Sequence, residues 1–192
     1  MPDHELLRIL GEIQRRGAIG PVDLTSAVAH ADGFVAAIPE SARTAIDLGS
    51  GGGLPGLVIG VRLPLLSLQL VERRAKRADL LRFAVRALGL GDHVVVVEAD
   101  AQLFADDVVA TGGLVDVVTA RSFAATEVLL PLAKRLLRPG GVLVVSDPPS
   151  GHGKWTQTQL QDADLVDRGS KGGVHLLERL DVPRGTSGTP TV

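Results

Sequence analysis

Residues 45–56 read AIDLGSGGGLPG, and five of these twelve residues are glycines. A short apolar run ends in Asp47, and Gly49, Gly51 and Gly53 then stand at alternate positions. At the carboxyl end of a strand in an α/β sheet, such a turn lets the main chain approach a bound ligand closely. The stretch therefore predicts a β-strand followed by a cofactor-binding turn.

Four more runs rich in Val, Leu and Ile end in turn residues, as buried parallel strands do. They occupy residues 65–72, 93–100, 114–120 and 141–147. Residues 73–91 and 126–141 carry apolar residues at helical spacing between these runs. Alternating strands and helices predict an α/β fold, a doubly wound and mostly parallel sheet with helices on both faces.

The two ends of the chain depart from this alternation. Apolar spacing predicts N-terminal helices within about 4–37, the first closing at residues 15–17 and the second covering about 23–37. After residue 150 no helix is expected; residues 174–182 form a late strand, and a hairpin with 160–166 is one arrangement that would pair it. We expect one domain over 1–184 and a disordered tail over 185–192.

Composition excludes several classes of function. The formal net charge is -2, so the chain has no global basic field, no DNA partner is expected, and any RNA contact must be a local patch. There is no cysteine, which excludes disulfides, thiolate metal sites and a Cys nucleophile; no metal site is expected. The sequence shows neither a signal peptide nor an apolar run of membrane-spanning length, so we expect a cytoplasmic protein without a membrane partner.

Two cofactor classes fit the glycine turn. Gly51, Gly53 and Gly56 satisfy G-x-G-x-x-G with Glu72 downstream, so a dinucleotide site stays open. Asp47 favours S-adenosylmethionine instead, because a carboxylate attracts its cationic methionine end but gains nothing beside a pyrophosphate. Glu72 ends the second strand and can bind ribose hydroxyls in both cases, and Asp100 ends the third, where it would reach the adenine amino group.

Simpler roles also exist for these residues: the glycines as a tight turn, Asp47 as a helix N-cap, and Asp100 as a solvated turn residue. The cationic face from Arg73 to Arg86 would either meet phosphate or be a solvated helix face. The candidate cofactor-binding residues are Asp47, Gly49, Ser50, Gly51, Gly53, Leu54, Glu72, Asp100 and Ala101.

Four segments carry a family resemblance. DLGSGGGLPG (47–56), LVERRAKRADLLR (70–82), VDVVTARSFA (115–124) and LLRPGGVLVV (136–145) resemble, in order and spacing, the bacterial 16S rRNA guanine-N7 methyltransferase family, known as RsmG or glucose-inhibited division protein B. The resemblance implies a class I S-adenosylmethionine-dependent methyltransferase that acts on a guanosine in the decoding-region loop, with 16S rRNA or the small ribosomal subunit as partner. It places Arg121 at the substrate side as the catalytic candidate, and Lys76 and Arg77 at the family's Lys-Arg pair as substrate-binding residues.

The implied reaction suits this composition, because guanine N7 has a free lone pair and needs neither a general base nor a nucleophile. Asp147 stands where the family has a lysine, and Lys154, Trp155 and Lys171 are alternative basic or stacking contacts. The DPPS motif at 147–150 resembles an amine-methylating motif but follows the fifth strand rather than the fourth. The alternatives are methylation of another RNA or a small molecule, a non-catalytic S-adenosylmethionine-binding protein, and an NAD dehydrogenase.

Overall fold

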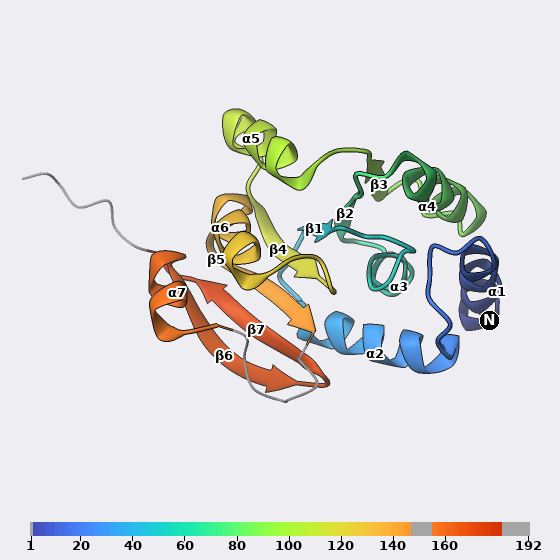
Figure 1. Cartoon of the computed structure of the whole chain (residues 1–192), viewed down its shortest axis with the longest axis horizontal. Helices are drawn as coiled ribbons and strands as arrows, with labels where there is room; N and C mark the ends of the chain where they lie inside the picture. The colour runs from blue at the N-terminus through green and yellow to red at the C-terminus, as the bar shows by residue number, and fades with distance from the viewer. Residues whose placement is uncertain (1, 147–154, 182–192) are drawn as a thin grey trace, which may run out of the picture.

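The computed structural model describes residues 2–146 and 155–181 and contains one seven-stranded sheet in the order β3-β2-β1-β4-β5-β7-β6 (Figure 1). The strands β1 to β5 run parallel, and β7 is antiparallel to both of its neighbours. The predicted α/β class, with a late antiparallel strand, is confirmed. The strands are β1 (Thr44–Leu48), β2 (Ser67–Val71), β3 (Val94–Val97), β4 (Val115–Ala120), β5 (Leu137–Ser146), β6 (Leu165–Lys171) and β7 (Val174–Arg179).

Strand register brings three chain segments to one edge of the sheet. Leu48 at the end of β1 pairs with Val71 of β2 on one side and with Ala120 of β4 on the other. The three strands therefore end at the same level, and the residues that follow them are neighbours: Gly49, Glu72 and Arg121. This edge is the ligand-binding edge of a parallel α/β sheet.

Helices cover both faces of the sheet (Figure 1). On one face, apolar residues of the first four helices form one buried cluster with β1 and β2; on the other, the last three helices bury a second cluster. No helix in the described part of the chain is long and apolar enough to cross a membrane. The helices are α1 (Pro2–Arg15), α2 (Leu24–Ala37), α3 (Gly56–Arg62), α4 (Ala75–Ala87), α5 (Ala101–Thr111), α6 (Thr126–Leu136) and α7 (Gln157–Asp162).

Several sequence-based expectations need correction. The expectation of no helix after residue 150 is wrong, because α7 occupies 157–162 with a capping box at Thr156. The late hairpin exists, but its first strand is 165–171 rather than 160–166. The strand β5 begins at Leu137, so the residues that were expected to form a turn after the helix belong to the strand. A register shift in the pairing of β4 with β5, between Val115 and Val117, accommodates them.

The domain limits stay predictions. The boundary at 184 and the tail 185–192 lie outside the described residues. The helix bounds agree closely where caps define them: Asp23 accepts a hydrogen bond from Ser26 N at the start of α2, which was expected from about residue 23.

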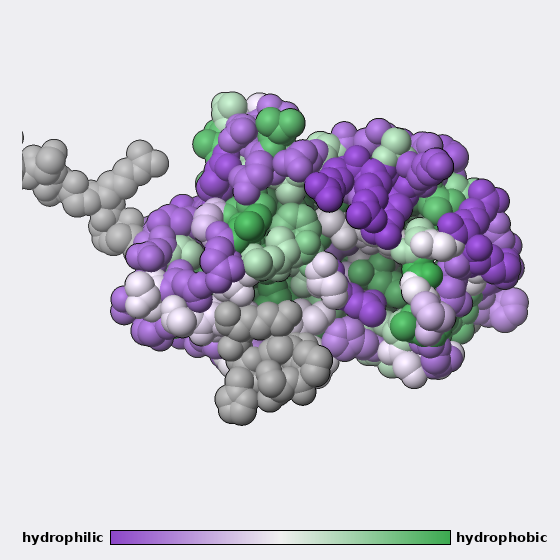
Figure 2. Space-filling view, in the orientation of Figure 1, coloured by the Kyte–Doolittle hydropathy of each residue, from purple (hydrophilic) through white to green (hydrophobic). Residues whose placement is uncertain are grey.

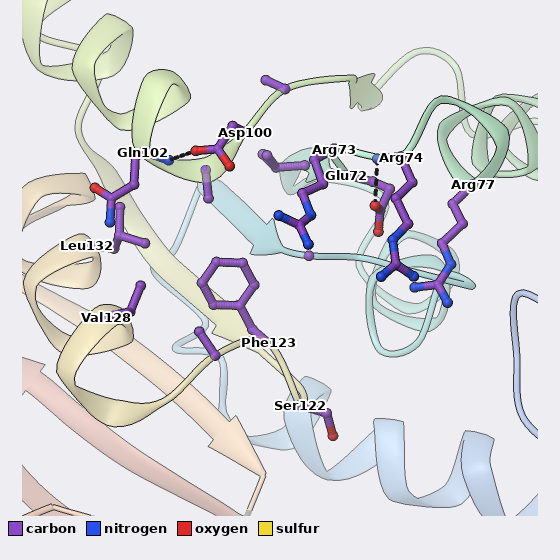
Figure 3. A pocket seen from close by; sticks show the side chains of 15 residues that line it. Glu72, Arg73, Arg74, Arg77, Asp100, Gln102, Ser122, Phe123, Val128 and Leu132 are labelled. Atoms are coloured by element: carbon purple, nitrogen blue, oxygen red, sulfur yellow. Dashed lines mark hydrogen bonds between the residues drawn. The ribbon is translucent and has the colours of Figure 1, made fainter.

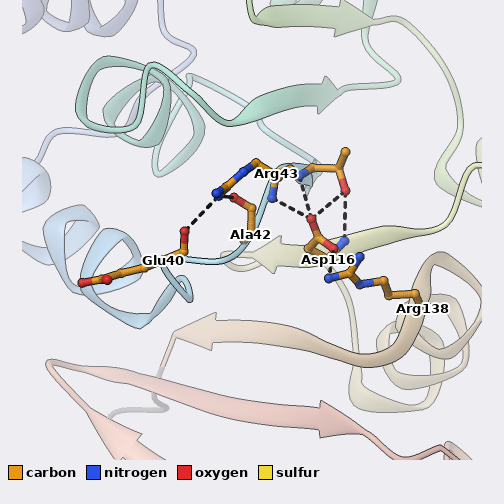
Figure 4. A network of polar contacts seen from close by, with 6 residues as sticks. Glu40, Ala42, Arg43, Asp116 and Arg138 are labelled. Carbon is orange, nitrogen blue, oxygen red and sulfur yellow. Dashed lines mark hydrogen bonds and ion pairs between the residues drawn. The ribbon is translucent and has the colours of Figure 1, made fainter.

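A buried acid joins three strands at their beginnings, at the end of the sheet opposite the ligand-binding edge (Figure 4). Asp116 of β4 accepts hydrogen bonds from the N–H groups of Arg43 and Thr44, at 2.6 and 2.9 Å, and pairs with Arg138 of β5 at 2.7 Å. Burial raises the pKa of Asp116, but these hydrogen bonds outweigh it and hold the pKa below its usual value. The network joins the beginnings of β1, β4 and β5, so that their other ends present a rigid edge.

Candidate functional site

The glycine loop lies between β1 and α3. Gly49 has φ +65°, and a Cβ added there would lie 2.5 Å from Cδ2 of Phe123, so only glycine fits beneath that ring. Gly53 allows a close contact between the loop and α3, because a Cβ added at this residue would lie 2.3 Å from Cδ1 of Leu57. Gly49 therefore faces the site, while Gly53 fits the loop against its helix.

Hydrogen bonds fix the loop to the neighbouring strands. The N–H of Ser50 donates to the carbonyl of Val71, at 3.0 Å, and its hydroxyl donates to the carbonyl of Asp47. The N–H of Gly51 donates to Oε2 of Glu72, also at 3.0 Å. The loop is thus held in place by β2 before any ligand is considered.

Glu72 combines a structural and a ligand-binding geometry. It is 5% exposed, and its Oε1 accepts a 2.8 Å hydrogen bond from the N–H of Arg74 while Oε2 accepts from Gly51. Each carboxylate oxygen accepts one such bond and has a second lone pair. The carboxylate is oriented by backbone donors and still has acceptor capacity for two hydroxyl groups.

Asp47 lies beneath the loop rather than in an open cavity. It is 1% exposed, its Oδ1 accepts a 2.6 Å hydrogen bond from Thr119, and its Oδ2 has no hydrogen-bond partner among the described residues. Burial raises the pKa of Asp47 to about 6, although the bond from Thr119 and the positive charge of Arg121 oppose the rise. Asp47 is not the N-cap residue of α3, which is Pro55, but the backbone N–H of Gly56 at the start of that helix is among the groups that lower its pKa.

Asp100 caps a helix that the sequence did not predict. Its Oδ1 accepts a 2.9 Å hydrogen bond from the N–H of Gln102 at the start of α5. The side chain also lines a cavity together with Ala101 and Glu72 (Figure 3). The helix cap explains why an acid follows β3. Because the Asp100 side chain also lines the cavity, its contact with adenine stays a prediction.

This cavity, which we call the β1–β3 cavity, has a volume of about 360 Å³ and lies over the ends of β1, β2 and β3. Figure 2 shows an apolar floor between the hydrophilic surface of α4 and the helix α6. Gly49 and Glu72 form one side, and three arginines stand along the rim (Figure 3). They are Arg73, Arg74 and Arg77.

Two further cavities adjoin the first. The β4–β5 cavity, about 280 Å³, is lined by residues of both strand ends and of α6, with His30 and Trp155 at its sides. The glycine-loop cavity, about 250 Å³, lies between the loop and residues 18–22 and is lined by Ser50, Gly51 and Leu54. Arg121 lines both of these and not the β1–β3 cavity. In the glycine-loop cavity it lies with predicted cofactor residues, and in the β4–β5 cavity it lies apart from them, so its place on the substrate side stays a prediction.

The other predicted contacts divide into two groups. Arg77 lines the β1–β3 and glycine-loop cavities, whereas Lys76 is exposed and lines none of the three cavities. Lys171 ends β6, away from the cavity linings. Asp147, the DPPS motif at 147–150 and Lys154 lie outside the described residues.

Sequence reasoning missed Phe123. Arg73 and Arg74, which open the cationic face that was considered for phosphate, follow Glu72 directly, and this explains their place on the rim. Phe123 follows Arg121 by two residues, but its contact with Gly49 joins positions 74 residues apart and leaves no local signal.

The β1–β3 cavity fits an S-adenosylmethionine-like molecule. Glu72 offers oriented acceptors for a ribose, Gly49 lets the ring of Phe123 lie close to the loop at the cavity wall, and Asp47 supplies a buried carboxylate with one unpaired oxygen close to the loop. A dinucleotide fits less well, because the sheet inserts β7 between β5 and β6, unlike the 3-2-1-4-5-6 order of dinucleotide-binding folds.

Solved structures define the class of fold. An O-methyltransferase from Bacillus cereus in complex with SAH superposes with a TM-score of 0.65 at 16% identity, covering 92% of this chain and 90% of that one. An O-methyltransferase structure from Klebsiella pneumoniae gives a TM-score of 0.64 at 17% identity, covering 93% and 90%. The chain has the class I methyltransferase fold.

Sequence comparison then identifies the family. Residues 32–164 match the family model for rRNA small subunit methyltransferase G, GidB, and the chain belongs to this family. A ribosomal RNA small subunit methyltransferase G from Acidothermus cellulolyticus is 35% identical over 166 residues, which cover 84% of this chain and 69% of the relative. The protein of that name from Rhizorhabdus wittichii is 44% identical over 90 residues, which cover 47% of this chain and only 39% of the relative.

Proposed function

We propose that this chain is an S-adenosylmethionine-dependent methyltransferase that methylates N7 of a guanosine in the decoding-region loop of 16S rRNA, in the cytoplasm. Family membership carries the proposal. The matched residues, 32–164, include every residue that lines the β1–β3 cavity. The relatives named above are rRNA methyltransferases by name, which supports the choice of RNA over a small molecule.

The cofactor assignment rests on the loop and on two acids. Glu72 is oriented to accept hydrogen bonds from ribose hydroxyls, and Asp100 and Ala101 line the same cavity beyond it. The similar Bacillus structure holds SAH, the product form of this cofactor, which supports the assignment. In this proposal the methionine end lies toward Gly49 and Asp47, where the buried carboxylate favours a cation.

The reaction depends on the positioning of the two reactants and not on proton transfer. S-adenosylmethionine would supply a methyl group on cationic sulfur; the N7 lone pair forms the new bond as the S–C bond breaks, its electron pair stays on sulfur, and the charge passes to the base. No proton moves in this step. The residues of the chain therefore hold two reactants in line, and Arg121, which lines the β4–β5 cavity, orients the acceptor.

A basic rim supports a polyanionic substrate. Arg73, Arg74 and Arg77 form no ion pair with the residues that the structure describes, and all three line the β1–β3 cavity. Guanidinium groups bind phosphate through paired N–H donors. Because the whole chain carries a net charge of -2, this patch and not the overall charge would attract RNA.

The test is transfer of labelled methyl from S-adenosylmethionine to small ribosomal subunits that lack the N7 mark, followed by borohydride and aniline cleavage to locate the product. We expect a single N7-methylguanosine in the decoding-region loop. Gly51→Asp is the matched inactive control, because its side chain would enter the loop cavity. Transfer to another RNA or to a soluble metabolite, or cofactor binding without any transfer, would refute the proposed substrate.

A further inference from the structure

One short segment separates the two principal cavities. Ser122, Phe123 and Ala124 line both the β1–β3 cavity and the β4–β5 cavity. The segment follows the end of β4 directly. If a cofactor lies on one side and an acceptor on the other, the transferred group must cross at this wall.

Phe123 is held firmly within that wall. Its ring edge lies against Gly49, where even one added methyl group would come within 2.5 Å of Cδ2. The preceding residue, Ser122, has φ +51°, an uncommon conformation for a residue other than glycine. Such outliers cluster at functional sites, where the surrounding structure maintains them.

The ring of Phe123 is available to a flat ligand. It projects between Val128 and Arg73 (Figure 3) and has no ring contact with any residue in the described ranges. By contrast, the Trp155 ring meets His175 edge-on at 5.0 Å, and its indole N–H donates to Asp167 at 3.1 Å.

The β4–β5 cavity has the chemistry of a nucleobase site. Its volume of about 280 Å³ lies just below the range for drug-sized ligands, which suits a single nucleoside. Aromatic rings stand beside polar groups, including Arg121 and the pair of His30 Nε2 and Ser146 Oγ, 3.3 Å apart. Enzymes that modify a base take it out of its stack into such a pocket and stack it on aromatic side chains.

We propose that Phe123 is the stacking residue for the acceptor guanine, which enters the β4–β5 cavity and places N7 at the shared wall. This inference rests on the proposed function and names the residue that positions its substrate. Phe123 then explains why Gly49 lacks a side chain: the edge of the ring lies against the loop at that residue.

Trp155 provides a direct readout, because it is the chain's single tryptophan and lines the same cavity. Guanosine 5′-monophosphate and its N7-methyl derivative are titrated against Trp155 fluorescence with SAH present. We expect saturable quenching in the wild type and affinity about 5- to 150-fold weaker in Phe123→Leu, the loss for one base–aromatic stack. Phe123→Tyr should restore the affinity, and SAH affinity by calorimetry should fall less in Phe123→Leu than nucleotide affinity does, since the ring also lines the cofactor cavity.

Phe83→Leu makes the same change on the exposed surface of α4 and should leave both titrations unchanged. The inference is overturned if about 10 mM nucleotide gives no saturable quenching, or if Phe123→Leu matches the wild type. It is also overturned if SAH affinity falls as much as nucleotide affinity, since Phe123 would then serve only the cofactor side. The methyl-transfer assay above tests the proposed function separately, because it can succeed when these titrations fail.

Discussion

Thr119 of β4 donates a 2.6 Å hydrogen bond to the carboxylate of Asp47 on the neighbouring strand β1, and both side chains are buried. The two residues are paired in the register of the sheet. The bond orients one carboxylate oxygen but does not offset the loss of hydration, so burial raises the pKa of Asp47 to about 6. A charged Asp47 is therefore costly for the free protein.

The first prediction concerns stability and pH. Between pH 3.8 and about 6, the folded chain holds a proton on Asp47 that the unfolded chain has released, so raising the pH destabilises the fold. The rise in pKa corresponds to about 3 kcal/mol at pH 7. The free energy of unfolding of Asp47→Asn, relative to that of the wild type, should rise by up to this amount between pH 4 and 7. Urea denaturation at several pH values measures it. Equal pH dependence of stability in the two proteins would contradict the prediction.

The second prediction uses two glycines with nearly the same backbone conformation. Gly49 has φ +65° and Gly89 has φ +66°, but an added Cβ meets Phe123 only at Gly49 and open space at Gly89. Alanine at either position should cost about 1 kcal/mol of stability from the left-handed conformation. Only Gly49→Ala should weaken SAH binding in calorimetry; equal SAH affinity in the two variants would show that the contact with Phe123 is irrelevant.

The third prediction concerns RNA phosphate. Arg77→Gln, at the cavity rim, should weaken binding to 16S rRNA and reduce the slope of log K against log salt by about one. Arg86→Gln removes the same charge in the last turn of the same helix and should leave the slope unchanged. Filter binding at four salt concentrations measures both, and equal slopes in the two variants would remove Arg77 from the interface.

Sequence patterns predicted the features that depend on residues close together in the chain. The strand ends and the glycine loop follow from apolar runs and turn residues, so Glu72 could be placed at the edge of the sheet from sequence alone. The strand β3 is four residues long, and the helix α5 begins four residues after it. The stretch AQLFADDVVAT mixes acids with apolar residues and lacks the basic face that marked α4, which is why this helix escaped prediction.

Contacts between distant segments could not be predicted. The burial of Asp47 depends on its register with Thr119, 72 residues away, and the place of Phe123 depends on its packing against Gly49. Pattern reasoning expected an acid facing a cofactor, and it did not foresee that the structure buries this acid beneath the loop. Direct contact between Asp47 and the cofactor stays a prediction.

The last prediction separates cofactor binding from transfer. Arg121 lines the β4–β5 and glycine-loop cavities but not the β1–β3 cavity that holds Glu72 and Asp100, so Arg121→Ala should leave SAH affinity within about threefold. Single-turnover methyl transfer should fall about 100-fold, the cost of misplacing an acceptor. Arg121→Lys keeps the charge but loses the planar fork of donors, so only partial recovery is expected if Arg121 binds the base edge or a phosphate through two hydrogen bonds. Full recovery of methyl transfer in Arg121→Lys would show that Arg121 acts through its charge alone. Equal losses of SAH affinity and of transfer in Arg121→Ala would place Arg121 with the cofactor.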